Sequence, residues 1–173
     1  MILHYFKKKE NEQFSSKYYI SIIKFIQNLY EENSYKLKKN FNTSFELTIL
    51  MIFIFYFSHK DNKFNPTKQE INDLFIEDLD LSFRNLGIGD MKIGKYVKKH
   101  VKKIYFRFGK LDKIFIENNY DAFHNYIKKI EIIDDNDNIL NKFCKFMFRL
   151  LNKHINSLNI NTFEGFDISI KNK

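Results

Sequence analysis

The ten residues from Gly87 to Tyr96, GIGDMKIGKY, come within one residue of a nucleotide-binding loop. From Gly89 to Lys95 they read G-x-x-x-x-G-K, a pattern in which glycines let backbone amides surround phosphate and the lysine reaches it. That loop also needs Ser or Thr after the lysine as a Mg²⁺ ligand and a buried strand before the glycines, whereas Tyr96 follows and LFIEDLDLSFRNL precedes with helical spacing. We therefore predict a helix–loop–helix corner that binds no nucleotide. Gly87 would end one helix, Gly89 would permit the bend, and Asp90 would cap the next helix.

Two aspartates just before this corner could suggest a metal site. Residues two apart on a helix point to nearly opposite sides, so Asp78 and Asp80 cannot easily share one ion. Asp80 can instead pair with Arg84 at the i,i+4 spacing. Asp78 lies nearer the apolar side of the helix, where a carboxylate needs a partner. We expect structural roles for both.

The remaining residues of chemical interest form no catalytic or metal-binding pattern. The single cysteine, Cys144, permits no disulfide within the chain, and no G-x-S-x-G sequence occurs. The five histidines have no metal-ligand spacing to one another or to the cysteine: His4, His59, His100, His124 and His154. The sequence therefore predicts no enzymatic activity, no bound metal and no cofactor.

The feature that stands out is a helix with one basic side. The net charge is +8 and the basic residues are 26 Lys and three Arg, an excess to which A/T-rich codon usage can contribute. Six of the basic residues fall on one side of a predicted helix with no acid among them: Lys95, Lys98, Lys99, Lys102, Lys103 and Arg107. No aromatic residues interleave with them, which makes base stacking with single strands less favoured. The partner would be RNA or a ribosome, an anionic membrane surface or an acidic protein, but not DNA; a simple solvated face is the alternative.

The elements that must carry these residues are helices. The chain has five Gly and one Pro, so few turns interrupt it. Apolar spacing predicts helices near 14–31, 44–60, 67–86, 91–116, 119–131 and 138–158, after a loose basic arm over residues 1–13. Thr43 and Glu46 have the spacing of a capping box. The run from Leu47 to Phe57 is too short to span a bilayer, which needs about 20 residues, and indicates a helix in a protein core. We predict an all-α, single compact domain of about six helices over residues 14–173, with the 44–60 helix at its centre.

The stretch from Leu74 to Arg107, LFIEDLDLSFRNLGIGDMKIGKYVKKHVKKIYFR, resembles the ubiquinol–cytochrome c chaperone family. The family pattern has an aspartate pair in a helix, a turn like L-R-E-M-G-V-G-D, and then V-G-K-R-V-K-K. The matching residues are Asp78, Asp80, Arg84, Gly87, Gly89, Asp90, Gly94, Lys95, Lys98 and Lys99. SFELTILMIFIFYF and FEGF resemble two further segments of the family. The chain departs from the pattern at Ser44, where the family has Arg, at Glu46 in place of Asp, and at Tyr96 in place of a basic residue.

The resemblance implies an all-helical assembly factor for the cytochrome bc1 complex without enzymatic activity. Its client would be newly made cytochrome b, and mitochondrial members of the family act with a small partner protein at the ribosomal tunnel exit. A bacterial member would be cytoplasmic and peripherally membrane-associated, and a eukaryotic one would lie on the mitochondrial matrix side. We expect the Phe-rich helices near 14–31 and 44–60 to supply an apolar client groove, and the basic helix to contact a ribosome or membrane. The alternative is a basic RNA- or ribosome-binding module with no membrane-protein client.

Overall fold

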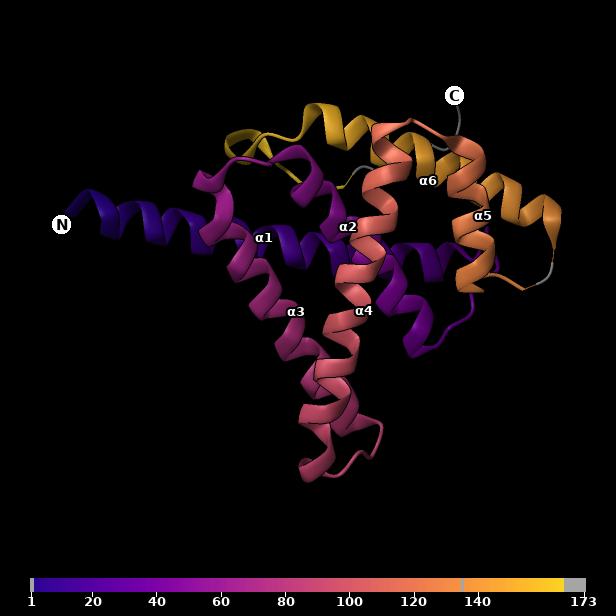
Figure 1. Cartoon of the computed structure of the whole chain (residues 1–173), viewed down its shortest axis with the longest axis horizontal. Coiled ribbons are helices and arrows are strands. Elements are labelled where there is room, and N and C mark those ends of the chain that lie inside the picture. Colours follow the sequence, from indigo (N-terminus) through magenta and orange to yellow (C-terminus); the bar gives the residue numbers. More distant parts are fainter. Residues whose placement is uncertain (1, 135, 167–173) are drawn as a thin grey trace.

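The computed structural model describes residues 2–134 and 136–166 of the chain. Within these ranges the fold is all-α, as predicted, and contains six α-helices (Figure 1). They are α1 (Ile2–Glu32), α2 (Phe41–Ser58), α3 (Asn65–Asn85), α4 (Asp90–Ile116), α5 (Tyr120–Ile130) and α6 (Asp137–Ser157). There are also two short 3₁₀ turns. The turn η1 (Asn62–Phe64) precedes α3, and η2 (Ile160–Thr162) follows α6. The sequence spacing thus located all six helices, but it placed the starts of α1 and α2 too late in the chain.

Helix α2 forms the centre of the domain. Every residue from Phe45 to Phe55 is buried, because α1, α3, α4 and α6 all pack against this helix. It is the one helix among the described residues that is long and apolar enough to cross a membrane, yet 67% of it lies buried inside the protein. A helix that is apolar on all sides is expected in a core of this kind.

Helix α1 begins earlier than the sequence spacing indicated. It starts at Ile2 instead of near residue 14, so the segment expected to be a loose arm is helical from its second residue. Residues 2–13 contain no Gly or Pro and several good helix formers, so no sequence signal ends the helix before Phe14. The division of the chain at residue 13 into an arm and a domain stays a prediction.

The start of α2 also differs from the expectation. The helix begins at Phe41, and the side chain of Asn40 accepts a hydrogen bond of 2.9 Å from the backbone amide of Thr43. Asn40 is therefore the N-cap, and Thr43 and Glu46 do not form the predicted capping box. Asn is among the strongest N-cap residues, and it precedes Thr43 by the three residues that this bond requires.

Helices α3 and α4 form an antiparallel hairpin whose corner projects from the rest of the domain (Figure 1). At the end of α3 the amide of Ile88 bonds to the carbonyl of Phe83 at 3.0 Å, and that of Gly87 bonds to Arg84 at 2.9 Å. This pair of bonds is a Schellman motif, and it requires the left-handed conformation found at Gly87, with φ of 78°. The predicted role of Gly87 in ending the helix is confirmed.

Candidate functional site

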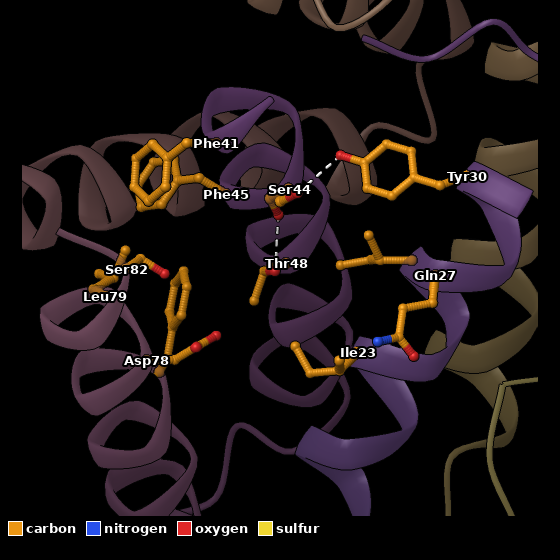
Figure 2. Close-up of a pocket in the computed structure, with 12 residues that line it drawn as sticks. Ile23, Gln27, Tyr30, Phe41, Ser44, Phe45, Thr48, Asp78, Leu79 and Ser82 are labelled. Atoms are coloured by element: carbon orange, nitrogen blue, oxygen red, sulfur yellow. Dashed lines mark hydrogen bonds between the residues drawn. The ribbon is translucent and has the colours of Figure 1, made fainter. Parts of the chain in front are cut away.

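A groove of about 170 Å³ lies where α1, α2 and α3 meet (Figure 2). The residues that line it come from all three helices: Ile23, Ile26, Gln27, Tyr30, Phe41, Ser44, Phe45, Thr48, Phe75, Asp78, Leu79 and Ser82. Its wall is mainly aliphatic and aromatic, and Phe45 lies against Phe75 with ring centroids 5.8 Å apart. A concave, mostly apolar site with a few polar groups is the usual form of a binding pocket.

The polar groups of the groove are held by bonds within α2 and by bonds between helices. The Tyr30 and Ser44 hydroxyls are hydrogen-bonded at 2.8 Å, and the Thr48 hydroxyl donates to the Ser44 carbonyl at 2.8 Å. From α1, the Tyr19 hydroxyl donates to Asp78 at 2.8 Å. Burial and the adjacent Asp78 carboxylate raise the pKa of Tyr19, so it remains a neutral donor at physiological pH. Asp78 therefore has the partner that its position required.

The groove is narrower than the apolar face that the sequence suggested. Most phenylalanines of α1 and α2 lie in the core, and Phe25, Phe53 and Phe55 are fully buried there. The surface that remains accessible includes the edges that face α3 and, elsewhere on α1, the 53% exposed Ile20. The sequence therefore pointed to two of the three helices that line the groove, and the binding of a client there stays a prediction.

Asp80 and Asp90 meet at a single arginine near the corner. The Arg84 guanidinium donates to Asp80 at 2.6 Å, as the i,i+4 spacing predicted, and also to Asp90. The Asp90 side chain makes no cap bond and is largely exposed, because α4 already begins at this residue and its N-cap is Gly89. The predicted capping role of Asp90 is wrong. Asp90 instead ties the first turn of α4 to the last turn of α3 through Arg84.

The other two family-motif glycines are not required by backbone shape. Gly89 has φ of −63° and ψ of 144°, an extended conformation open to any residue. A Cβ added at Gly89 or at Gly94 would meet no atom within 4 Å. The expectation that Gly89 is needed for the bend is therefore wrong. The corner also lacks the strand that a phosphate-binding loop follows, since α3 precedes it.

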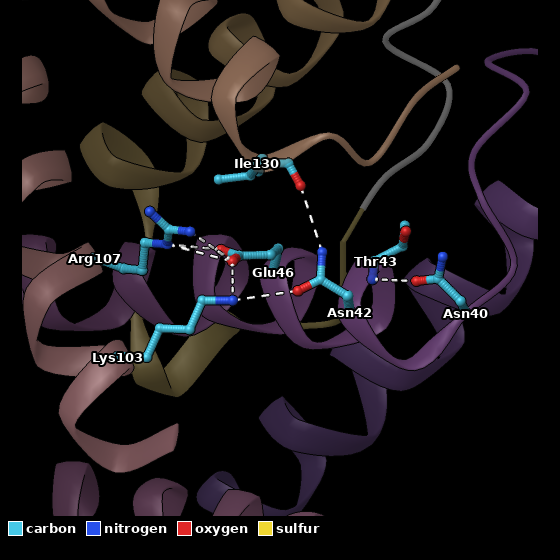
Figure 3. Close-up of polar contacts among 7 residues, drawn as sticks. All are labelled: Asn40, Asn42, Thr43, Glu46, Lys103, Arg107 and Ile130. Carbon is cyan, nitrogen blue, oxygen red and sulfur yellow. Dashed lines mark hydrogen bonds and ion pairs between the residues drawn. The ribbon is translucent and has the colours of Figure 1, made fainter. Parts of the chain in front are cut away.

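A buried carboxylate on α2 forms ion pairs with two of the six cations that were predicted to lie on the surface (Figure 3). The Glu46 side chain is 0% exposed, and Arg107 binds both of its oxygens, with the shortest bond at 2.9 Å. The Lys103 ammonium lies 2.7 Å from the same carboxylate and 3.2 Å from the Asn42 side chain. Arg107 also lies over the ring of buried Tyr126. Arg107 therefore faces inward, Lys103 remains partly exposed, and both join α4 to α2 through Glu46.

The other four cations lie where the sequence placed them. Lys95, Lys98, Lys99 and Lys102 are exposed on α4, and no ion pair with them occurs among the described residues. Two exposed aromatic residues lie on the same side of the helix, namely Tyr105 and Phe106. The expectation that no aromatic interleaves with these lysines is therefore wrong. That expectation placed Tyr105 in the apolar stripe of the helix, whereas the Tyr105 side chain is exposed to solvent.

The residues that could have held a metal are far apart or buried among rings. His100 packs edge-on against Phe45 and Phe41, and burial together with the charges of Lys103 and Lys99 lowers its pKa. Cys144 is buried in the core, which raises the pKa of its thiol to about 12. Among the described residues, no three His, Cys, Asp or Glu side chains come together as a metal site.

Comparison with known proteins identifies the family. The sequence profile of the family described as "Ubiquinol-cytochrome C chaperone" matches residues 33–130, which include all of α2, α3, α4 and α5. The chain belongs to this family. The ubiquinol–cytochrome c chaperone match thus includes Glu46 and its two cations, the corner, and two sides of the groove, while the α1 side lies before it.

A solved structure has the same fold as this chaperone-family chain. It is the crystal structure of the Cbp3 homolog from Brucella abortus, with a TM-score of 0.78, 22% sequence identity, and coverage of 98% of both chains. At this identity the likeness establishes the fold alone. A search among curated proteins gave no match.

Proposed function

We propose that this protein is a non-enzymatic assembly chaperone of the cytochrome bc1 complex that holds newly made cytochrome b. Its membership of the ubiquinol–cytochrome c chaperone family supports the assembly role. The observation that carries the client-binding part is the groove between α1, α2 and α3. In this proposal the groove takes an apolar side chain from a helix of cytochrome b before haem and partner subunits cover that helix.

The chemistry of the groove suits a helix of a membrane protein. Half-buried side chains such as Ile23, Tyr30 and Phe41 offer apolar contact, and shielding apolar surface from water stabilises the complex by about 25 cal/mol per Å². Gln27, Ser82 and Asp78 lie among them and can orient a polar group of the client. Helix-in-groove binding uses this combination of a hydrophobic floor and a few polar contacts.

A second surface would keep the chaperone near the place where cytochrome b is inserted. The exposed lysines of α4, Lys95, Lys98, Lys99 and Lys102, can contact anionic headgroups or ribosomal RNA phosphate. The lysines are on α4, whereas the groove is lined by α1, α2 and α3. One molecule can therefore bind its client and a membrane or ribosome at the same time. A small partner protein could take part, as in mitochondrial members of the family.

Deletion of the gene tests the assembly role. We expect the deletion strain to contain less cytochrome b and less assembled bc1 complex, while other respiratory complexes stay near their normal levels. The intact gene should restore bc1, and a groove variant, Ile23→Arg, should fail to do so at equal protein abundance. Normal bc1 levels in a deletion strain that encodes no second family member would contradict the proposal.

The second candidate is a basic RNA- or ribosome-binding module with no membrane-protein client. The exposed lysines, with Tyr105 and Phe106 on the same side of α4, favour it. Salt separates the two, because binding to RNA phosphate falls steeply with ionic strength whereas an apolar client stays bound. Retention of ribosomal RNA and ribosomal proteins alone in a pull-down, with no cytochrome b at any salt concentration, would support this candidate.

A further inference from the structure

We propose that the outer side of α4 is a membrane-docking surface for anionic lipid, formed by a lysine–aromatic stripe of Lys95, Lys98, Lys99, Lys102, Tyr105 and Phe106. This inference rests on the proposed function and deepens it, since it selects lipid as the partner of the exposed lysines. It adds apolar insertion to electrostatic attraction. This proposal gives a role to the exposed lysines and aromatic side chains of α4, which do not line the groove.

The stripe combines positive charge with exposed apolar side chains. Its four lysines are exposed, and Tyr105 and Phe106 are 63% and 57% exposed. At 100° per residue all six project to one side of α4, and no acidic residue occurs from Met91 to Lys110. This length of helix covers about 30 Å, at about 1.5 Å per residue. A uniform positive surface of this length is complementary to an anionic bilayer.

Apolar side chains continue beyond the stripe to the end of the hairpin. Met91 is 101% exposed and Leu86 is 60% exposed on either side of the corner. At the other end the Lys110 ammonium lies 4.6 Å from the centre of the Phe106 ring, so cation and aromatic side chain reach solvent together. Tyrosine is enriched at membrane–water interfaces because its ring is amphipathic, and lysine can extend to the headgroups beside it.

The geometry favours lipid over RNA. Proteins that bind single strands place aromatic side chains along a positively charged groove that follows the backbone. The stripe lies instead along the outer side of one helix, whose opposite side packs onto the domain through Ile93 and Ile104. Met91 and Leu86 are aliphatic and have no flat ring face on which a base can stack. A helix that lies flat in the interface needs only one exposed face of this kind.

The composition also favours lipid over an acidic protein. Protein–protein interfaces are enriched in arginine and depleted of lysine, whereas all four cations of the stripe are lysines. Two further cations of the predicted basic side, Lys103 and Arg107, are bound by Glu46 and do not contribute. The membrane surface is therefore the partner whose chemistry the exposed residues fit best.

Vesicle flotation with the purified full chain tests the charge. We expect it to float with vesicles of an equal mixture of phosphatidylcholine and phosphatidylglycerol, and not with phosphatidylcholine alone. Near an anionic surface each lysine contributes a factor of about five, so replacing all four stripe lysines with Gln should lower the affinity roughly 600-fold. The matched control replaces four exposed lysines on other elements with Gln, namely Lys36, Lys129, Lys142 and Lys145, and should keep most of the binding.

A single fluorophore tests the insertion of the aromatics. The chain contains no Trp, so Phe106→Trp introduces one reporter at the stripe. We expect its emission to shift to the blue on anionic vesicles and to be quenched by brominated lipid. Replacing both Tyr105 and Phe106 with Ser should weaken binding roughly tenfold, since part of two rings no longer leaves water. Emission that stays unchanged while the protein floats would overturn the insertion of the aromatics.

The outcomes separate this inference from the proposed function. The vesicles contain no cytochrome b, so they test lipid binding alone. Failure of the unaltered chain to float would overturn the membrane-docking surface, while the deletion strain would still test the client-binding proposal. Equal losses in the stripe and control variants would also overturn it, because net charge alone would then explain binding. Tight binding of oligouridine by a chain that does not bind anionic vesicles would assign the stripe to RNA.

Discussion

The buried carboxylate of Glu46 should be a major contributor to stability, and Glu46→Gln tests this. The side chain has no contact with solvent and accepts bonds from Arg107 and Lys103 at 2.9 and 2.7 Å. The amide keeps the shape of the side chain but removes its charge. Arg107, whose side chain is 15% exposed, would then remain as a largely buried cation without its counter-charge.

The size of the effect follows from the exposure of the two cations. Removing one partner of a buried ion pair costs about 3–5 kcal/mol. Lys103 is 33% exposed and can turn its ammonium toward solvent, so the lower end of the range applies, about 3 kcal/mol. In a chain of this size each kcal/mol shifts Tm by about 2–4 °C, so Tm should fall by about 6–12 °C.

Thermal unfolding followed by circular dichroism measures the effect. The matched control is Asp80→Asn, which makes the same change from acid to amide in an exposed pair with Arg84 and should cost less than about 1 kcal/mol. Replacing Glu46, Lys103 and Arg107 together with Met should restore most of the stability, because no buried charge is then left. The reasoning would be refuted if the Tm of Glu46→Gln equalled that of Asp80→Asn, or if the triple Met variant were less stable than Glu46→Gln.

Two further predictions concern the corner and the response to pH. Gly87→Ala should destabilise the protein by about 1–2 kcal/mol because the residue has φ of 78°, whereas Gly89→Ala should change little; equal effects in urea unfolding would contradict the role of the Schellman motif. Burial, with the charges of Lys103 and Lys99, holds the pKa of His100 below its unfolded value of 6.5, and burial also lowers that of His59. The unfolded chain therefore takes up protons first, so stability should be full above about pH 6.5 and should fall as the pH drops below it. His100→Gln should reduce this slope in melting curves measured across that range, and an unchanged slope would assign it to other groups.

The helices and the core helix could be predicted because they depend on neighbours in the sequence. Apolar residues recur at helical spacing in α3 and α6, and Gly87 stands at the end of the first of these patterns. The run of α2 is apolar on every side, and only a core position buries all of it. Local capping was less predictable, because the sequence pointed to Thr43 as the cap whereas the backbone makes Asn40 the N-cap.

The groove and the ion pairs of Glu46 could not be predicted because they join residues far apart in the chain. Glu46 and Arg107 are separated by 61 positions, and no spacing rule connects α2 with α4. One signal was present: an acid adjoins a long apolar run, where a charge needs a buried partner. The groove requires the relative placement of three helices. The exposure of Tyr105 likewise depends on how α4 is rotated against the helices that it packs on.

The central claim, that the groove holds newly made cytochrome b, is tested most directly by site-specific photo-crosslinking in cells. A photoreactive residue placed at Gln27 or Ser82 lies in the groove, and one at Lys142 on α6 serves as the control on another surface. We predict a crosslink to cytochrome b from Gln27 and Ser82 that is absent from Lys142 and that strengthens when haem supply is limited. Crosslinks to cytochrome b of equal yield from all three positions, or none from the groove, would contradict the account.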